Sequence, residues 1–205
     1  RRNWASYKQA GRGGIGTVFT DKNILAIIVR APKILRSINP FDAEILKATS
    51  KEHSTGIITH DPHQNELRAV GTAHLPEIMN EYDLFPTENF RFGKHHSLKS
   101  EELPYHREVW RKILTDTGKG LDGCHLMCPL NCSHHTKEHV VLSGPLKGQK
   151  VVVDGPEYET IGGCGSNWGI WDPHWVLEAN FYCDTYGLDT ISVGTGIAFV
   201  LECYE

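Results

Sequence analysis

The apolar and polar residues in the first half of the chain form blocks that predict a strand, a helix and a long loop. The unbroken apolar run 24–29 is typical of a buried β-strand. A helix is predicted over residues 41–49, because the preceding Asn39-Pro40 is a favourable helix start. Residues 50–100 are rich in His, Gly, Pro and Asn, so we expect a loop region facing a substrate or cofactor, with one short helix near residues 75–82.

The second half of the chain predicts helices separated by one hairpin. Two β-prone stretches flank a turn rich in Gly and Pro, which is the pattern of an antiparallel hairpin. Asp172-Pro173 and Gly187 are the start and stop signals of a helix. The expected elements are helices over 101–114 and 174–186, a hairpin pairing 138–142 with 150–153, and a last helix beginning near 194–196.

Composition narrows the class of protein. The 205 residues are 40% hydrophobic and 22% charged, which suits a folded chain of one large domain or two small ones. A net charge of -4 argues against a nucleic-acid partner, and no apolar run is long enough for a membrane span or a signal peptide. Clustered cysteines suit a reducing compartment, so we expect a cytoplasmic protein. The chain has no initial methionine and stops within a helical pattern, which indicates a fragment.

Three cysteines near the middle of the chain form the evenly spaced pattern C-x3-C-x3-C. Cys124, Cys128 and Cys132 can wrap one face of an iron–sulfur cubane, whose corners are bound by thiolates, and a fourth ligand would come from elsewhere. Zinc also binds thiolates, but its usual sites have two C-x2-C pairs, and the sequence has no second pair. Three unrelated buried cysteines are the remaining alternative.

A glycine-rich segment near the start, Gly11-Arg12-Gly13-Gly14-Ile15-Gly16, offers chemistry suited to a phosphate. Its backbone N–H groups and its guanidinium are both good anion donors. It is not a Walker A motif, because no Gly-Lys-Ser/Thr follows, and not a Rossmann fingerprint, because the apolar run comes after it. A plain tight turn is the alternative interpretation.

Two acidic motifs supply candidate acids, bases and hydrogen-bond acceptors. Glu157 and Glu159 lie two residues apart, and an extended backbone would put both carboxylates on one face, where a closed pocket would make them a usable acid or base. A solvated surface pair is the alternative. Asp184 and Asp189 can accept hydrogen bonds from an amino-substituted heterocycle, although they equally suit a helix end followed by a helix start.

Taken in this order, the motifs resemble those of the aldehyde:ferredoxin oxidoreductase family of tungstopterin enzymes. The most specific part is Gly155-Pro-Glu-Tyr-Glu-Thr followed by Asp184-x-x-Gly-Leu-Asp189, and residues 10–18 are similar to another family segment. The resemblance implies an α+β fold in two parts. Residues 1–32 would end a β-rich, pterin-cradling N-terminal domain, and residues 33–205 would form part of a mainly helical middle domain carrying the iron–sulfur loop.

The resemblance also implies a reaction and its cofactors. It implies oxidation of an aldehyde to a carboxylic acid at a tungsten bis-pyranopterin, with Mg2+ bridging the two pterins. Electrons would leave through a [4Fe-4S] cluster to ferredoxin or to an iron–sulfur subunit. The remaining parts of the same enzyme would be further partners, a homodimer is compatible with the family, and neither nucleic acid nor membrane is expected.

The family pattern assigns roles to single residues of this chain. Glu159 would face the tungsten as the proton-transfer group, with Glu157 as second choice. The other assignments by resemblance are Arg12 on a pterin phosphate, the backbone of Gly13 near the magnesium, Asp184 on a pterin ring with Leu188 and Asp189 beside it, and Cys124, Cys128 and Cys132 on the cluster. The family's cluster loop is C-x2-C-x3-C, so this chain has one extra residue between Cys124 and Cys128.

Two other functions compete with aldehyde oxidation. The tungsten subunit of a class II benzoyl-CoA reductase belongs to the same superfamily, and its Thr-Glu-Asn-Phe segment is similar to residues 87–90. Pro-Glu-Tyr-Glu favours the aldehyde enzymes instead. A non-catalytic iron–sulfur electron-transfer module is the second alternative, but it leaves the phosphate-type loop and the paired carboxylates without a role.

Overall fold

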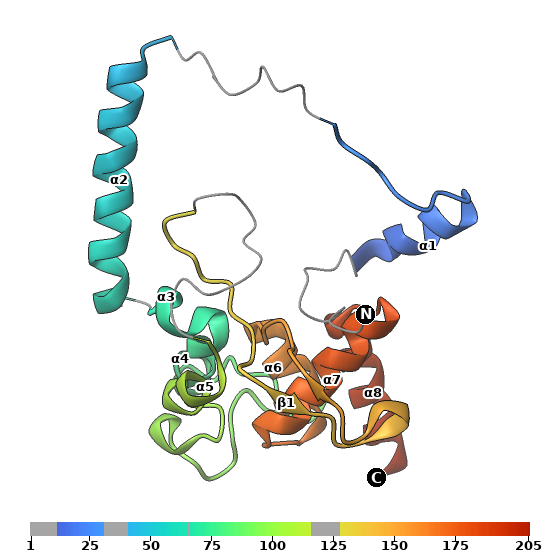
Figure 1. Ribbon diagram of the computed structural model, residues 1–205. Coiled ribbons are helices and arrows are strands. Elements are labelled where there is room, and N and C mark those ends of the chain that lie inside the picture. Colours follow the sequence, from blue (N-terminus) through green and yellow to red (C-terminus); the bar gives the residue numbers. More distant parts are fainter. Residues whose placement is uncertain (1–11, 31–40, 65, 116–127) are drawn as a thin grey trace.

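The computed structural model describes residues 12–30, 41–64, 66–115 and 128–205 (Figure 1). Within these ranges the chain is mostly helical with one two-stranded sheet, which is compatible with the α+β class. None of the helices described there is both long and apolar enough to cross a bilayer. The elements are η2 (Arg12–Gly14), α1 (Ile15–Asp21), α2 (Ala43–Gln64), α3 (Leu67–Val70), η3 (Gly71–His74), α4 (Leu75–Glu81), η4 (Ser100–Glu102), α5 (Arg107–Ile113), β1 (His139–Val140), η5 (Gly144–Leu146), β2 (Lys150–Val151), α6 (Tyr158–Cys164), η6 (Ser166–Trp168), α7 (Pro173–Tyr186) and α8 (Thr190–Tyr204).

The prediction of a strand at residues 24–29 is wrong. This segment has no regular secondary structure and is open to solvent, with Leu25 99% and Ile28 89% exposed. A strand needs a neighbour to take up its backbone hydrogen bonds, and in the ranges described here the only sheet is the distant β1–β2 pair. We expected residues 1–32 to end a β-rich domain. Their described part, residues 12–30, instead forms a 3-10 turn and a short helix and no strand.

Helix α2 is longer than the helix predicted over residues 41–49. It continues to Gln64 and so includes the first part of the loop predicted over residues 50–100. Its start is fixed by Asp42, whose carboxylate accepts a hydrogen bond of 2.9 Å from the backbone N–H of Ile45. Its end is fixed by Asp61, which is 4% exposed and accepts hydrogen bonds of 3.0 Å from the backbone N–H groups of Leu67 and Arg68. Asp61 thus satisfies the first donors of α3 and joins the two helices.

An aromatic core lies between the loop after α4 and the helices that follow it. The short helix predicted near residues 75–82 is confirmed as α4, and the helix predicted over 101–114 is confirmed in a shorter form as α5. Tyr105 stacks between Trp110 and Trp171, with ring centroids 6.0 and 5.4 Å apart, and Phe85 meets it edge-on at 6.4 Å. Burial raises the pKa of Tyr105, so its hydroxyl stays protonated and donates to the Ile170 carbonyl at 2.5 Å.

The predicted hairpin and the predicted helix after it are both confirmed, and a buried carboxylate joins them. Strands β1 and β2 are antiparallel, and α7 ends at Gly187 in the left-handed conformation. Glu178 of α7 is 2% exposed and accepts bonds from His139 Nε2 at 3.0 Å, Leu142 N at 2.9 Å, and the Ser143 backbone and hydroxyl at 2.8 Å each. The hairpin is therefore fixed against the helix that lines the candidate site.

We expect the replacement Glu178→Gln to destabilise the protein, and more at neutral than at acid pH. Burial alone raises the pKa of Glu178, but the hydrogen bonds from Leu142, His139 and Ser143 lower that pKa below its ordinary value. A lowered folded-state pKa gives stability above the unfolded-state pKa, which is lost as the pH falls through the folded value. Replacing a buried, hydrogen-bonded carboxylate by a neutral group typically lowers the free energy of unfolding by about 2–4 kcal/mol.

Denaturant unfolding of full-length wild type and variant between pH 7 and pH 3 measures this difference. The gap in the free energy of unfolding should narrow as the pH falls. Glu52→Gln, on the exposed middle of α2, is the matched control and should behave as wild type at every pH. A gap that stays constant with pH would contradict the assignment of an ionised Glu178.

The last helix begins earlier than predicted, at Thr190 and not near residues 194–196. Asp189 is the N-cap, and its carboxylate accepts from the backbone N–H groups of Ile191 and Ser192 at 3.3 and 3.2 Å. Gly194 lies inside α8 because the helix crosses α6 closely there: a Cβ at this position would be 2.8 Å from the carbonyl carbon and oxygen of Gly163. Gly194 is therefore a packing residue of this crossing and does not mark the helix start. Figure 1 shows α6, α7 and α8 side by side in orange and red.

Candidate functional site

A cavity of about 550 Å3 lies where the ends of four elements meet. This volume is within the range of small-molecule sites. The helix start of α6, the last turn of α7, the first turn of α8 and the 3-10 turn η2 all contribute side chains to its wall. The lining residues are Arg12, Ile15, Thr72, Asp154, Gly155, Glu157, Glu159, Thr160, Asn180, Asp184, Leu188, Asp189 and Thr190. Six residues assigned by resemblance are therefore neighbours in space: Arg12, Glu157, Glu159, Asp184, Leu188 and Asp189.

The two glutamates occupy different positions from those predicted. The segment is not extended through both, because α6 begins at Tyr158, so Glu157 is the N-cap residue and Glu159 lies in the first helical turn. Glu157 Oε2 accepts a hydrogen bond of 2.5 Å from the Thr72 hydroxyl. Glu159 is exposed and makes neither a hydrogen bond nor an ion pair with any residue in the described ranges. Tyr158 lies between the two glutamates in the sequence. Its burial and the negative charge of Glu159 both raise the pKa of Tyr158.

Asp184 lies on the last turn of α7 and is oriented by a buried amide. The Nδ2 atom of Asn180, one turn earlier, donates to Asp184 Oδ2 at 3.2 Å and to the Asp154 carbonyl at 2.5 Å. Asn180 is 6% exposed, so its amide is held away from water. Asp184 therefore presents its carboxylate to the cavity in a fixed orientation, as an acceptor for N–H groups of a ligand.

Asp189 connects the glycine-rich segment to the helical body. Its Oδ1 is 3.1 Å from Arg12 Nε, and residues 177 positions apart are joined by this ion pair. Burial alone raises the pKa of Asp189, but hydrogen bonds from Ser192 and Arg12 and from the start of α8 lower it, so it is ionised. This bond uses one of the five guanidinium donors of Arg12, and the exposed remainder suits a phosphate. Gly13, next to Arg12, has a φ of +73° that favours glycine.

The cysteine loop is only partly within the described residues. Cys124 lies outside them, whereas Cys128 and Cys132 are described and half-buried. Within the described ranges no three His, Cys, Asp or Glu side chains come together as a metal site. The three-cysteine ligand set therefore stays a prediction.

Buried polar atoms beside Cys132 fit a group bound at this loop. Ser133 and His134 are 6% and 3% exposed, yet Ser133 Oγ and His134 Nε2 have no hydrogen-bond partner within the described structure. Buried polar atoms are nearly always paired, so two orphans next to one predicted ligand indicate that something else occupies their surroundings. The other ring nitrogen, His134 Nδ1, lies 3.1 Å from the Thr115 carbonyl.

Helix η3 lies against the cysteine loop and requires a glycine there. Gly71 has a φ of +62°, and a Cβ on it would be 2.6 Å from the Cys132 carbonyl oxygen. The guanidinium of Arg68, just before Gly71, donates to the Pro129 carbonyl of the same loop. Gly71 is followed directly by Thr72, so η3 contacts both the cysteine loop and the cavity.

We expect Gly71→Ala to disturb the cysteine loop. The added methyl group must push the Cys132 backbone away, and alanine also disfavours the left-handed conformation, at a cost of about 1–3 kcal/mol. If this loop binds the predicted iron–sulfur cluster, iron bound per chain in the full-length protein should fall well below that of wild type. Gly56→Ala in α2, where nothing lies within 4 Å of the new methyl group, should leave the iron content unchanged. An unchanged iron content in Gly71→Ala would contradict the prediction that η3 shapes the cysteine loop.

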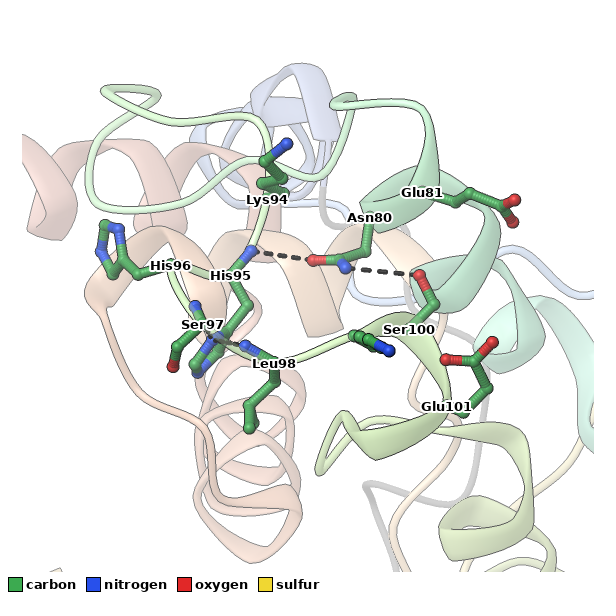
Figure 2. A pocket seen from close by; sticks show the side chains of 10 residues that line it. Asn80, Glu81, Lys94, His95, His96, Ser97, Leu98, Ser100 and Glu101 are labelled. Carbon is green, nitrogen blue, oxygen red and sulfur yellow. Dashed lines mark hydrogen bonds between the residues drawn. The ribbon is translucent and has the colours of Figure 1, made fainter.

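A second cavity, of about 400 Å3, lies on another part of the surface and has no chemistry that we can assign (Figure 2). It contains the adjacent His95 and His96. His95 Nδ1 accepts from the backbone N–H groups of Ser97 and Leu98 at 3.1 and 3.0 Å, and burial lowers the pKa of His95. His96 Nε2 is 2.7 Å from Glu88 Oε1. Both rings are thus used to hold the local loop.

The remaining cysteines are of two kinds. Cys164 and Cys183 are buried, at 0% and 3% exposure. Their mutual contact and their burial raise the pKa of Cys164, so its thiol stays protonated. Cys203, in contrast, is exposed on the last turn of α8.

The cavity gathers acidic side chains around one arginine, and η3 connects it to the cysteine loop. Residues 48–205 match the sequence model of the family described as "Aldehyde ferredoxin oxidoreductase, domains 2 & 3". The chain therefore belongs to the aldehyde ferredoxin oxidoreductase family, as the motifs predicted.

Relatives with curated names agree with this family. The chain is 31% identical over 206 residues to the tungsten-containing aldehyde ferredoxin oxidoreductases of Pyrococcus horikoshii and Pyrococcus furiosus. It is 27% identical over 198 residues to the "Aliphatic sulfonate oxidoreductase, WOR-like subunit" of Pyrococcus furiosus. These matches include 97%, 97% and 96% of this chain but only 30%, 30% and 28% of the relatives, so the chain spans about a third of their length or less.

Proposed function

We propose that this chain is the part of a tungstopterin enzyme that oxidises an aldehyde to a carboxylic acid. The observation that supports this most directly is the cavity, which gathers Arg12, Asp184 and Asp189 with the paired Glu157 and Glu159. The two Pyrococcus relatives that are 31% identical to the chain are named as tungsten-containing aldehyde ferredoxin oxidoreductases. Residues 1–32 would complete a pterin-binding domain, and residues 33–205 would belong to the helical part.

The residues of the cavity suit distinct tasks in this reaction. Arg12 would bind a pterin phosphate, and Asp184, Leu188 and Asp189 would hold one pterin ring, with magnesium near Gly13. Oxidation of an aldehyde with water to an acid releases two electrons and two protons. When bound, a tungsten–dithiolene centre accepts the electron pair. Glu159 takes up a proton at its carboxylate and returns it to water.

The cysteine loop would hold the electron outlet. Cys124, Cys128 and Cys132 would bind three corners of a [4Fe-4S] cluster, and electrons would pass singly to ferredoxin or to an iron–sulfur subunit. The orphaned atoms of Ser133 and His134 support a group bound beside Cys132. The remaining parts of the enzyme would supply the fourth ligand and the rest of the substrate pocket.

Metal analysis of the full-length native protein tests this proposal. Tungsten with about four irons, the content of one cubane cluster, is the expected result. Zinc alone, or iron without tungsten, would reject it. Assays with benzaldehyde and with benzoyl-CoA, using a one-electron dye as acceptor or donor, then separate aldehyde oxidation from reduction of an aromatic thioester.

A further inference from the structure

We propose that Thr72 is a positioning residue that holds Glu157 as a hydrogen-bonded carboxylate and leaves Glu159 as the acid that exchanges protons. This inference rests on the proposed function and deepens it, because it gives a structural reason for ranking Glu159 above Glu157 and assigns Glu157 a role of its own. Thr72 belongs to η3, which is 85 residues from Glu157 in the chain.

The direction of the hydrogen bond follows from the single hydrogen of a hydroxyl group. The backbone N–H of Tyr158 donates to Thr72 Oγ1 at 2.9 Å, which occupies a lone pair of this oxygen. The hydroxyl hydrogen is then directed to Glu157 Oε2, 2.5 Å away. Glu157 accepts this bond as a carboxylate oxygen, so Thr72 both fixes the glutamate and satisfies the first backbone donor of α6.

Glu157 does not cap its own helix, although it occupies the N-cap position. Its side chain makes no capping hydrogen bond, and the Thr72 hydroxyl takes that role from a different element. The glutamate side chain is therefore turned toward Thr72 and the cavity. Its neighbour Glu159 lies in the same cavity wall with no hydrogen bond to the described residues, which leaves its carboxylate able to rotate and to accept a proton.

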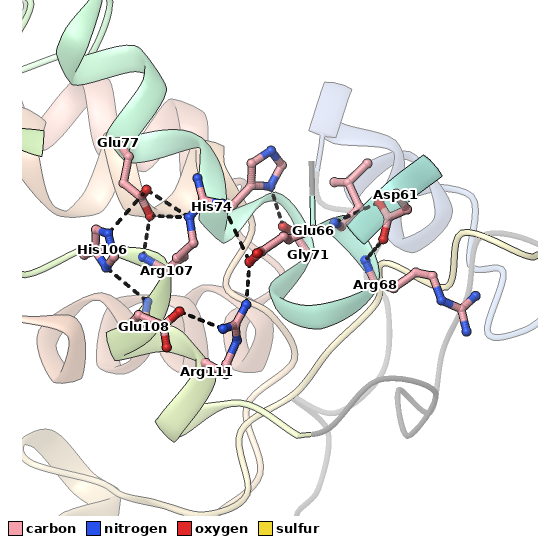
Figure 3. Close-up of polar contacts among 11 residues, drawn as sticks. Asp61, Glu66, Arg68, Gly71, His74, Glu77, His106, Arg107, Glu108 and Arg111 are labelled. Carbon is pink, nitrogen blue, oxygen red and sulfur yellow. Dashed lines mark hydrogen bonds and ion pairs between the residues drawn. The ribbon is translucent and has the colours of Figure 1, made fainter. Parts of the chain in front are cut away.

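Thr72 lies on a turn that has an internal side-chain contact and continues into α4, which is bonded to Arg107 at the start of α5 (Figure 3). His74 Nδ1 lies 2.9 Å from the Gly71 carbonyl within the turn. On the following helix, Glu77 accepts from the backbone N–H of Arg107 at 2.6 Å and from its Nε at 2.9 Å. A side chain on such a turn has little freedom, so its hydroxyl defines where the Glu157 carboxylate lies.

The hydrogen bond is tested first without reference to catalysis. In the full-length protein, Thr72→Val should speed hydrogen exchange at the start of α6, because the Tyr158 amide loses its acceptor. Thr72→Ser keeps the hydroxyl and should retain wild-type protection. Thr59→Val makes the same chemical change on the exposed α2 and should leave α6 unaffected. Unchanged exchange in Thr72→Val would overturn the inference.

The role in turnover is tested by a double-mutant cycle with Glu157→Gln. Thr72→Val should lower kcat about tenfold with KM nearly unchanged and with full tungsten and iron content, whereas Thr72→Ser should stay close to wild type. If Thr72 acts through Glu157, the same substitution in the Glu157→Gln background should have almost no further effect. An equal loss in both backgrounds would show a general structural role and would overturn the inference.

The two proposals fail in different ways. A wild-type enzyme that lacks tungsten or does not oxidise aldehydes rejects the proposed function, while the exchange experiment still decides whether Thr72 holds the start of α6 and Glu157. An active wild-type enzyme in which Thr72→Val has normal kcat and normal exchange rejects only the assignment of Thr72.

Discussion

Replacing Glu159 by Gln in the full-length enzyme should leave tungsten and iron bound and reduce kcat by about 10²- to 10⁴-fold, the usual contribution of a positioned acid or base. The amide has the size and shape of the carboxylate but cannot take up a proton. Glu159 lines the cavity from the first turn of α6 and has no partner in the described chain that would compete for its oxygens. Steady-state kinetics with benzaldehyde, together with metal analysis of the same sample, measures both parts of the expectation.

Two variants make this result interpretable. Glu44→Gln on the exposed α2 should have wild-type kcat and shows the effect of the chemical change alone. Glu157→Gln should lower kcat less than Glu159→Gln, because its role is to accept the Thr72 hydroxyl and to shape the wall. If Glu159→Gln turned over at the wild-type rate, the proton-transfer role would pass to Glu157 or to a histidine.

Replacing Gly194 by Ala should destabilise the site more than any other single methyl group added to the crossing of α6 and α8. The new Cβ would be 2.8 Å from the Gly163 carbonyl, a backbone atom that cannot rotate away. The two helices must separate, and overpacking of this kind typically costs about 1–3 kcal/mol. Because α6 carries Glu159 and α8 begins at Asp189, the separation also widens the cavity.

Hydrogen exchange of α6 and α8 in the full-length protein, with the midpoint of thermal unfolding, measures the effect. The control is Gly196→Ala, two residues farther along the same helix, where nothing lies within 4 Å of the added methyl group. Alanine is a better helix former than glycine by about 0.5–1 kcal/mol, so this control should be neutral or slightly stabilising. Equal behaviour of the two variants would show that α6 and α8 are not in close contact.

The parts of the fold predicted correctly are those determined by local signals. Helix α7 has Asp172-Pro173 at its start and Gly187 at its end, and the hairpin has its turn between two β-prone runs. Residues 24–29 were misjudged because an apolar run is a strand only when other strands pair with it. The start of α8 was misplaced because Gly194 looks like a boundary, whereas its actual role depends on a helix about 30 residues earlier in the chain.

The candidate site could be predicted in its residues but not in its arrangement. The acidic motifs identified Glu157, Glu159 and Asp184, and the cavity brings these residues together. Thr72 carries no sequence motif, and the sequence alone assigns no role to the Asn180 amide. Only the folded chain shows that their donors reach Glu157 and Asp184. The division of work between the two glutamates therefore depends on contacts between distant segments.

The uncovered run at residues 24–29 has a practical consequence for handling the protein. Ile27 and Val29 are 72% and 87% exposed, and the segment combines β-branched residues with a backbone that is paired to no strand within the described residues. An exposed, extended apolar segment of this kind can pair with the same segment of another molecule. Any preparation that leaves this run open should self-associate increasingly as its concentration rises, and a lysine introduced at Ile27 should keep it dispersed.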